Sequence, residues 1–236
     1  RSSDHLATPP EGKPRQILWR SYAPQTLLCA GATERPIAFE NNDRPGIMLA
    51  ASLRAYANRW AATPAQRVAI FTNNDDGHRT AQDLHAKGVK IAAVIDTRSD
   101  APRSHDYEVL QGAQVADTKG RLGLTFVEVT QADGSTRTHG ALTSGRDAAR
   151  KARGLKGRAP AAPEAEDAPV TQTPFWYVEG CSRAWLDQQN DVTVKDVKLS
   201  HQEGFRSVEH LKRYTTLGMA TDQGKTSNMG GLAIMA

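Results

Sequence analysis

The sequence has few cysteines, few aromatic residues and no long apolar run. Two of its 236 residues are cysteine and 6% are aromatic, and no stretch of about 18 residues is apolar throughout. Cys29 and Cys181 are too few for a disulfide framework and lack the paired spacing of zinc or iron–sulfur ligands. The first residues contain no apolar core typical of a signal peptide. We therefore expect a cytoplasmic protein that does not contact a membrane.

The sequence also lacks a large excess of charge of either sign. It has 30 Lys and Arg against 26 Asp and Glu, a net charge of +4. The one dense basic stretch, residues 146–158, is read as a solvated helix face, so we expect no nucleic-acid partner. His78, His85, His201 and His210 show no i, i+4 pairing supported by a carboxylate. We expect surface histidines and no metal site.

Composition divides the chain into two folded regions. Residues 154–173 are mainly Lys, Gly, Ala, Pro, Glu and Asp, which bury too little apolar surface to offset the entropy of ordering. We predict a flexible linker over 154–173, between folded regions at 1–153 and 174–236. We expect an α/β fold, with part of a Rossmann-like FAD- or NAD(P)-binding domain in the first region and a small helical module in the second.

The clearest local pattern predicts a βαβ unit. A buried strand is predicted over 67–71, a turn over 72–77, a helix over 80–87 ended by Gly88, and a second strand over 89–95 closed by Asp96. An acid after the second strand is typical of a dinucleotide-binding unit. The other predicted elements are short strands at 16–20 and 26–30, a helix within 47–60, and a hairpin of strands 122–130 and 135–139 around an Asp-Gly turn.

The turn of this unit does not favour a nucleotide. A dinucleotide turn reads G-x-G-x-x-G, whereas residues 72–77 read TNNDDG and keep only Gly77. Asp75 and Asp76 would lie at the helix N-terminus, where free N–H groups attract anions, and would repel a diphosphate. We expect the unit to keep the fold without binding a dinucleotide in its own turn.

Several motifs resemble one enzyme family. They are AGATERP (30–36), NDRPG (42–46), FTNNDDGHRTA (71–81), QNDVT (189–193), EGFRSVEH (203–210) and KRYTTLGMATDQGKTSN (212–228). In this order they resemble the α (large) subunit of heterotetrameric sarcosine oxidase. The resemblance implies a partial subunit, without its first nucleotide-binding half and without the aminomethyltransferase-like domain that follows in the family.

The resemblance also implies a function. The whole complex would convert sarcosine to glycine, hydrogen peroxide and formaldehyde or 5,10-methylenetetrahydrofolate, a step of one-carbon metabolism. FAD would lie in a β subunit, FMN between α and β, and NAD in the α subunit, and smaller subunits would complete the heterotetramer. We expect this chain to be inactive alone and to contribute no catalytic residue.

The C-terminal region is predicted to form two short helices. Thr193 is a plausible N-cap with Asp196 at N3, and Val194, Val197 and Leu199 would form an apolar face before Gly204. Ser207 would cap the second helix and Gly218 would end it. The region resembles a small [2Fe–2S]-binding domain without its cysteines. The resemblance places Asp187, Gln189, Asp222 and Ser227 at the ligand positions, so no cluster is expected.

A polar loop in this region is a candidate phosphate site. Glycine N–H groups, a lysine and hydroxyls suit a phosphate monoester. We predict that the α side of the FMN site is lined by Lys212, Arg213, Thr215, Thr216, Gln223, Gly224, Lys225, Thr226 and Ser227. The alternative is that these residues cap helices and face the β subunit. Gly31 and Ala32, in a small-residue turn, are the candidate nucleotide contacts in the first region.

Two other functions stay open. The chain could be the matching subunit of an opine or D-amino-acid dehydrogenase, which cysteines at positions 187, 189, 222 and 227 would have favoured. It could also be a non-catalytic scaffold that docks a flavoprotein and binds no cofactor.

Overall fold

The computed structural model describes residues 7, 8, 10–12, 16–18, 20, 22, 24, 32–63, 65–140 and 171–236. The chain forms two compact units, Arg1–Ala32 and Thr33–Ala236. In the first unit the described residues form no helix or strand. The strand predicted over 16–20 is therefore wrong for its described residues. Leu18 is 81% exposed, so no apolar burial offsets the entropy of ordering there. The strand predicted over 26–30 lies outside the described residues.

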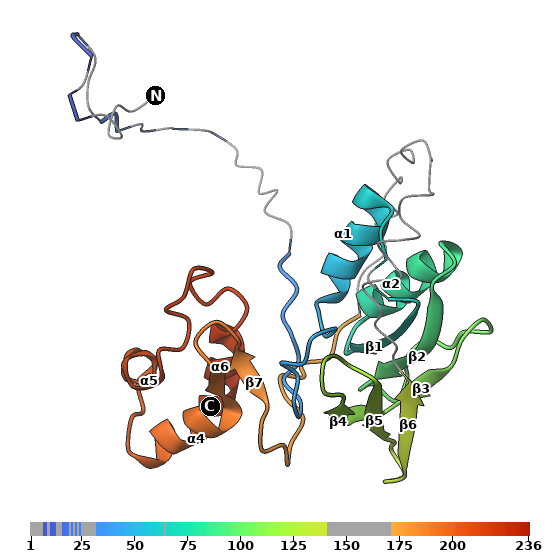
Figure 1. Ribbon diagram of the computed structural model, residues 1–236. Coiled ribbons are helices and arrows are strands. Elements are labelled where there is room, and N and C mark those ends of the chain that lie inside the picture. The colour runs from blue at the N-terminus through green and yellow to red at the C-terminus, as the bar shows by residue number, and fades with distance from the viewer. Residues whose placement is uncertain are drawn as a thin grey trace. The chain divides into compact units, whose positions relative to one another are not determined.

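The second unit contains all the described helices and strands (Figure 1). The helices are α1 (Ala50–Trp60), α2 (Asp75–Ala86), α4 (Val194–Gln202), α5 (Val208–Thr215) and α6 (Asn228–Met235). The strands are β1 (Arg67–Thr72), β2 (Lys90–Asp96), β3 (Val109–Gln111), β4 (Gln114–Lys119), β5 (Phe126–Thr130), β6 (Thr136–Gly140), β7 (Trp185–Asp187) and β8 (Val192–Thr193). In the described part of the chain, no helix is both long and apolar enough to cross a membrane.

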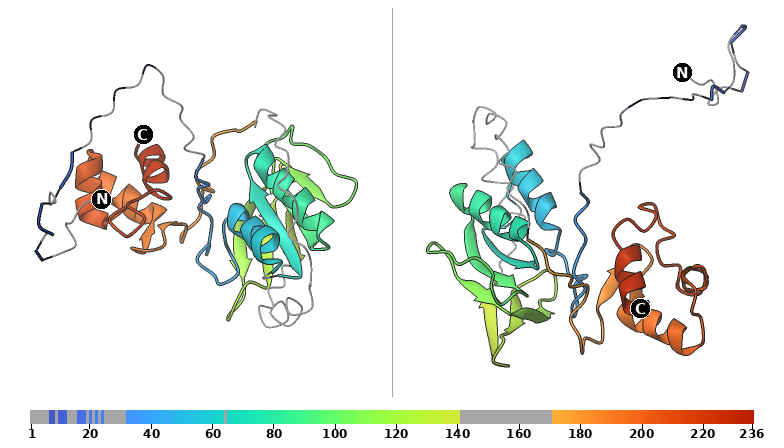
Figure 2. Two further views of the ribbon diagram at one scale, coloured as in Figure 1. Left: turned by 90° about the horizontal axis from the view of Figure 1, so that it is seen from above. Right: turned by 180° about the vertical axis from the view of Figure 1, so that it is seen from behind.

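The predicted βαβ unit is confirmed. Strands β1, β2 and β3 form a parallel sheet in that order, and α2 connects β1 to β2. Helices α1 and α2 cover one face of this sheet through a shared core that includes Leu53, Leu84 and Val94 (Figure 2). The α2 helix begins at Asp75, earlier than predicted, because the Asn74 side chain caps it.

A second sheet covers the other face of the parallel sheet. Strands β4, β5 and β6 are antiparallel, and the predicted Asp-Gly turn joins β5 to β6. Ala93 and Ile95 of β2 pack against Val115, Val127 and Val129 of this second sheet. The α/β class is thus confirmed, with two helices, a parallel sheet and an antiparallel sheet in successive layers.

The last part of the chain is a small helical module around its own core. This core includes Leu186, Val192, Val197, Leu211 and Leu217. The strands β7 and β8 pair antiparallel and lead directly into α4. The module, defined here as residues 181–236, presents α4, α5 and α6 around this core.

The predicted capping of α4 is confirmed and that of α5 is only partly correct. Thr193 and Asp196 form a reciprocal capping box. Leu199, which we placed on the apolar face, is 40% exposed because the core takes Val194 and Val197 instead. Ser207 is the N-cap of α5 but makes no side-chain capping bond.

The C-terminal end of the segment predicted as a linker is bound to the sheet. Thr173 N–H donates to Asn73 O at 3.2 Å, and Gln172 forms a bridge with Asn74. Further on, the Phe175 ring lies against that of Phe71 at 6.3 Å. Residues 171–175 therefore belong to the α/β part, whereas the Tyr177 side chain packs on the core of the module.

Candidate functional site

The turn at residues 40–44 joins the α/β part to the helical module. Asn42, 2% exposed, accepts the Trp185 N–H at 2.8 Å and donates to Trp185 O at 3.0 Å. The Glu40 carboxylate accepts from the N–H and hydroxyl of Ser182 and from Arg183 N–H. The Asn42 side-chain amide pairs with Trp185 of β7 as the backbone of a neighbouring strand would, because it satisfies both the N–H and the C=O of that residue.

The same turn is tied to β4. Asn41 Nδ2 donates to the Asp117 carboxylate at 2.8 Å. The Arg44 guanidinium donates to both oxygens of Thr118 at 3.1 Å and also to Gly120 O. The NDRPG motif that carries the family resemblance is thus a structural brace between the two parts.

The backbone N–H groups at the start of α2 already have hydrogen-bond acceptors within the chain. Asn74 Oδ1 accepts from Asp76 N–H at 3.0 Å and from Gly77 N–H at 3.3 Å. Asp75 N–H donates to Thr171 O at 3.2 Å. An anion at this helix end would have to displace these three bonds.

A buried ionic network lies beside this helix start. Asp96, 0% exposed, accepts from His78 Nε2 at 2.7 Å and from Arg98 Nη2 at 2.8 Å. Arg98 Nη1 reaches the Asp75 carboxylate at 2.8 Å and Thr171 O at 3.0 Å. Our prediction that His78 is a surface residue is wrong, because α2 turns it toward the end of β2, where it is 6% exposed.

Burial and hydrogen bonding shift the pKa values of the Asp96 and Asp75 carboxylates in opposite directions. Burial alone would raise the pKa of Asp96, but the hydrogen bonds from His78 and Arg98 outweigh it and hold that pKa below its ordinary value. Burial likewise opposes the shift at Asp75, where bonds from Thr171 N–H and Arg98 hold the pKa below its ordinary value. The pKa of Arg98 is raised by Asp96 and Asp75. Asp75, Asp96 and Arg98 are therefore all charged at neutral pH.

These contacts occupy the groups that a dinucleotide would use in this turn. The Asp96 carboxylate at the end of β2 already accepts hydrogen bonds from Arg98 and His78. The N–H groups at the start of α2 also already have acceptors. Gly77 has a packing role, because a Cβ there would lie 2.3 Å from the Thr72 hydroxyl. Gly31 lies outside the described residues, and Ala32 is exposed.

In the module, the positions assigned to cluster ligands hold its loops together. Asp187, 3% exposed, accepts from the N–H groups of Gln189, Asn190 and Gly218 at 2.8–3.1 Å. Gln189 Oε1 accepts the Thr221 hydroxyl at 2.7 Å. The carboxylate and the amide thus connect the loop after β7 to the loop after α5 by hydrogen bonds.

The other two positions assigned to cluster ligands, Asp222 and Ser227, differ in their hydrogen bonding. Asp222 accepts from Gly224 N–H at 2.9 Å and from the Thr226 hydroxyl at 2.7 Å, and these bonds lower its pKa. It therefore takes up donors that we assigned to a phosphate. Ser227, 1% exposed, has a hydroxyl without a partner among the described residues. A buried hydroxyl without a partner is costly, and this donor stays unused within the described part of the chain.

The predicted flavin-lining residues fall into two groups. The side chains of Arg213 and Lys225 are exposed and that of Lys212 is half-buried, and the structure gives none of these cations a hydrogen-bond or ion-pair partner in its described part. The hydroxyls of Thr215 and Thr216 bond to backbone carbonyls at the end of α5. These two threonines serve the helix end, as the helix-capping alternative expects.

Close packing fixes the conformation of the loop between α5 and α6. Gly218 and Gly224 both have positive φ, and a Cβ on either would lie 2.1–2.2 Å from the Asn228 side chain. Gln223 also has a positive φ, of 52°. Asn228 thus packs against both glycines of the loop between α5 and α6, which also carries Lys225. The α5 helix itself ends at Thr215 with Thr216 left-handed, so Gly218 does not end it as predicted.

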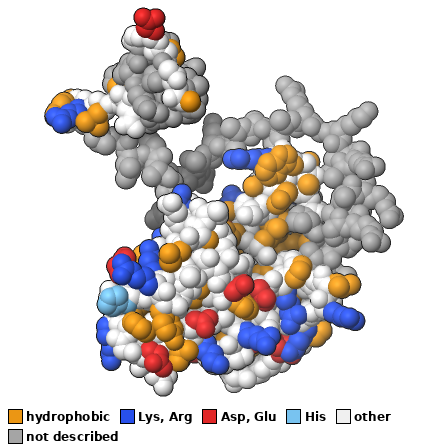
Figure 3. Space-filling view, turned by 60° about the vertical axis from the view of Figure 1, so that its left-hand side comes forward, with side chains coloured by type: hydrophobic (Ala, Val, Ile, Leu, Met, Phe, Trp, Pro, Cys, Tyr) orange, Lys and Arg blue, Asp and Glu red, His pale blue; other side chains and the backbone are white. Residues whose placement is uncertain are grey.

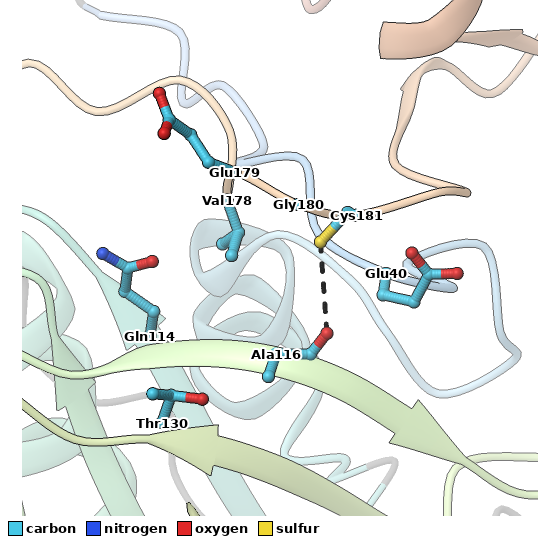
Figure 4. Close-up of a pocket in the computed structure, with 8 residues that line it drawn as sticks. All are labelled: Glu40, Gln114, Ala116, Thr130, Val178, Glu179, Gly180 and Cys181. Carbon is cyan, nitrogen blue, oxygen red and sulfur yellow. Dashed lines mark hydrogen bonds between the residues drawn. The ribbon is translucent and has the colours of Figure 1, made fainter. Parts of the chain in front are cut away.

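A pocket of about 380 Å³ lies between the turn at Glu40 and the second sheet (Figure 4). Its lining residues are Glu40, Gln114, Ala116, Thr130, Val178, Glu179, Gly180 and Cys181. Burial raises the pKa of the Cys181 thiol, which lies 4.0 Å from Ala116 O. The lining has two carboxylates and no basic side chain, so it does not suit a phosphate.

Sequence reasoning missed Arg98, Asn42 and Asn228. Arg98 comes two residues after a strand-ending acid, a spacing that permits a pair but does not require one. Asn228 packs against Gly218 and Gly224, ten and four residues before it, and no pattern in the sequence indicates this contact. Among the described residues, no group of three His, Cys, Asp or Glu side chains could hold a metal ion.

Comparisons with known proteins support the resemblance found in the motifs. Residues 181–236 match the family model described as the Sarcosine oxidase A3 domain. All of this chain matches the sarcosine oxidase subunit alpha of Rhizobium meliloti (strain 1021) at 35% identity, covering 30% of that protein. It matches the subunit of Corynebacterium sp. (strain U-96) at 30% identity, covering 33% of it. The chain is thus similar over its whole length to part of sarcosine oxidase α subunits, and it spans about a third of their length.

A solved structure has a similar fold. It is an L-proline dehydrogenase from P. horikoshii, with a TM-score of 0.56 and 13% identity over 87% of this chain and 51% of the other. At this identity the similarity concerns the fold alone. The specific likeness of the module to a [2Fe–2S]-binding domain stays a prediction.

Proposed function

We propose that this chain acts as part of the α subunit of a sarcosine oxidase and that its module forms one side of an FMN site facing a FAD-bearing subunit. The observation that carries the proposal is the full-length similarity to sarcosine oxidase α subunits, with the A3 domain match over the module. The assembled enzyme would oxidise sarcosine with oxygen and water to glycine, formaldehyde and hydrogen peroxide. With tetrahydrofolate, the one-carbon product would be 5,10-methylenetetrahydrofolate.

The residues of the module fit the phosphate of FMN at the start of α6. Lys225 is exposed and the Ser227 hydroxyl is buried without a partner. A helix N-terminus attracts an anion, and the ammonium of Lys225 adds a full charge. Asp222 already satisfies Gly224 and Thr226, so these two contribute a fixed loop rather than phosphate contacts.

The bound flavin would supply the electron transfer to oxygen. This chain's part is to bind and orient it. Lys212 and Arg213 lie at the end of α5, next to the loop that Asn228 packs against, and would add positive charge around the phosphate. No described residue of the chain is assigned to proton abstraction from the amine.

NAD does not fit the β1–α2 turn, because its donors and its strand-end acid are already bound internally. If the complex holds NAD through this chain, the contacts lie around Gly31 and Ala32. In this proposal the α/β part supports the module through the brace at residues 40–44.

Flavin content in an assembled complex tests the proposal. The chain is coexpressed with the FAD-bearing subunit of a sarcosine oxidase, and extracted FMN and FAD are quantified by chromatography. We expect one FMN per complex, and about tenfold weaker FMN retention in Lys225→Ala, because a charge-assisted contact contributes about 1.5–3 kcal/mol. Lys195→Ala, exposed on α4, is the matched control. Equal FMN retention in both variants would remove Lys225 from the site.

A scaffold without a cofactor is the second candidate function. The observation that favours it is Asp222, which occupies loop donors that a phosphate would otherwise use. A complex that copurifies with FAD but contains no FMN would establish this alternative.

A further inference from the structure

An exposed aromatic cluster lies along the outer side of α5. The Phe205 ring is 4.9 Å from that of Tyr214 and 6.3 Å from that of His210. Tyr214 is 46% exposed and His210 is also exposed. The rings therefore hold one another in place while a large part of their surface stays in water.

An arginine is held next to this cluster. Arg206 Nη1 lies 2.7 Å from His201 Nε2, and because a guanidinium can only donate, the histidine nitrogen accepts. The other N–H groups of Arg206 have no partner among the described residues. Since Arg206 is exposed, its fixed guanidinium can receive a carboxylate in a bidentate pair. We call Phe205, Arg206, His210 and Tyr214 the α5 patch.

The α5 helix buries little of its own surface. It has eight residues, and Leu211 is its one buried residue. Short helices depend on tertiary packing for stability, so a helix this exposed gains from a partner that covers it. Aromatic residues and arginine, already fixed in place, are the side chains that contribute most to protein interfaces.

The charge around the patch selects the kind of partner. Residues 194–216 contain five Lys or Arg and three Asp or Glu, and of these acids Glu203 and Glu209 are exposed, three residues to either side of Arg206. One of these acids, Asp196, is engaged in the α4 capping box. In Figure 3 basic, acidic and hydrophobic side chains are interspersed over the face turned toward the viewer. Such a surface complements one that presents carboxylates next to apolar side chains.

We propose that the α5 patch docks an acidic segment of the FAD-bearing subunit, with a carboxylate on Arg206 and an apolar side chain over Phe205 and Tyr214. This inference rests on the proposed function and adds a contact separate from the flavin-lining residues. The patch would hold the two subunits together whether or not FMN is bound. Binding should therefore weaken with increasing ionic strength, because the contact depends on charge.

Affinity between the intact chain and the FAD-bearing subunit tests the proposal. Dissociation constants are measured by titration calorimetry at low and high salt. We expect at least a tenfold weaker complex for Arg206→Glu and for Tyr214→Ala, and a smaller loss for Arg206→Lys, which keeps the charge. Arg121→Glu, a charge reversal at an exposed site between β4 and β5, should bind like the wild type. Circular dichroism and thermal unfolding verify that each variant is folded.

Each outcome separates the two proposals. If the wild-type chain does not bind the subunit, the proposed function fails. If it binds but Arg206→Glu and Tyr214→Ala bind equally well, the α5 patch is not the contact and this inference fails alone. Loss of self-association in Arg206→Glu would assign the patch to a second copy of this chain. Binding of a single-stranded DNA probe that requires Arg206 would show phosphate recognition and also overturn the inference.

Discussion

At the scale of single residues, Arg98 determines how the end of the parallel sheet is closed. Its guanidinium joins Asp96 of β2, Asp75 at the start of α2 and the carbonyl of Thr171, which are far apart in sequence. A buried charge that loses its partners is strongly destabilising, so each carboxylate matters more for stability than a surface ion pair would. Because of this network, the free energy of unfolding depends on pH in the acidic range.

The pKa directions of Asp75 and Asp96 give the sign of that dependence. Both pKa values lie below the ordinary one in the folded state. Their stabilisation is therefore complete above the unfolded pKa of about 3.9 and is lost as the pH falls through the lower folded value. We expect the free energy of unfolding in urea to fall below about pH 4.

The Asp75→Asn variant isolates one of the two groups. It should unfold with about 1–2 kcal/mol less free energy at pH 7, where it lacks the charge that faces Arg98. Its loss of stability from pH 5 to pH 3 should be smaller than that of the wild type. Urea titrations followed by circular dichroism at each pH measure both quantities, and equal acid slopes for the two proteins would contradict the assignment.

At the scale of elements, the sequence predicted those features that depend on local chemistry. The capping box of α4 and the Asp-Gly turn of the β5–β6 hairpin follow from side chains within a few residues, and both are confirmed. The start of α2 was predicted too late, because the pattern alone did not show that Asn74 would cap it. The strand at 16–20 was predicted from apolar content, which does not show whether a neighbouring strand is available.

The candidate site was less predictable than the elements, because its state also depends on contacts that the sequence pattern does not show. Arg213 and Lys225 are exposed. Whether a hydroxyl or carboxylate is already bonded depends on contacts within its loop, and Thr215, Thr216 and Asp222 are bonded in this way. Whether the remaining groups contact FMN stays a prediction.

The loop between α5 and α6 depends on its glycines. Gly224 has φ of 75°, and a Cβ there would lie 2.2 Å from the Asn228 amide. We expect Gly224→Ala to lower the free energy of unfolding by about 3 kcal/mol, from left-handed strain together with overpacking. Gly204→Ala is the matched control: its φ is 92° with no neighbouring atom within 4 Å, so strain alone should cost about 1–2 kcal/mol.

Urea unfolding of the two glycine variants measures this difference. The diagnostic quantity is the gap between them, since both carry the same backbone strain. A Gly224→Ala protein as stable as Gly204→Ala would mean that Asn228 can move aside without cost.

At the scale of the whole molecule, the chain after residue 170 is held by the α/β part before it reaches the module. Val178 N–H donates to Ala38 O at 2.8 Å, and Asn42 bonds both backbone groups of Trp185. These contacts connect residues more than 100 positions apart in sequence. They should therefore hold two separate polypeptides together.

A split chain tests this expectation. Fragments 1–150 and 160–236, coexpressed with a tag on the first, should copurify. Asn42→Ala should weaken their association by about thirtyfold, since two hydrogen bonds of about 1 kcal/mol each are lost. Asn58→Ala, which removes a bond to Asp83 within the first fragment, is the control and should leave association unchanged. Fragments that purify separately would show that the connection through residues 141–170 is required.

The brace at Asn42 has a practical consequence for spectroscopy. Trp185 is held by both backbone groups at the junction, and its indole Nε1 is buried without an acceptor in the described part of the chain. An indole shielded from water emits at shorter wavelengths than a hydrated one. In a variant whose other three tryptophans are replaced by phenylalanine, its fluorescence therefore offers an intrinsic probe of whether the junction stays closed when a flavoprotein subunit is added.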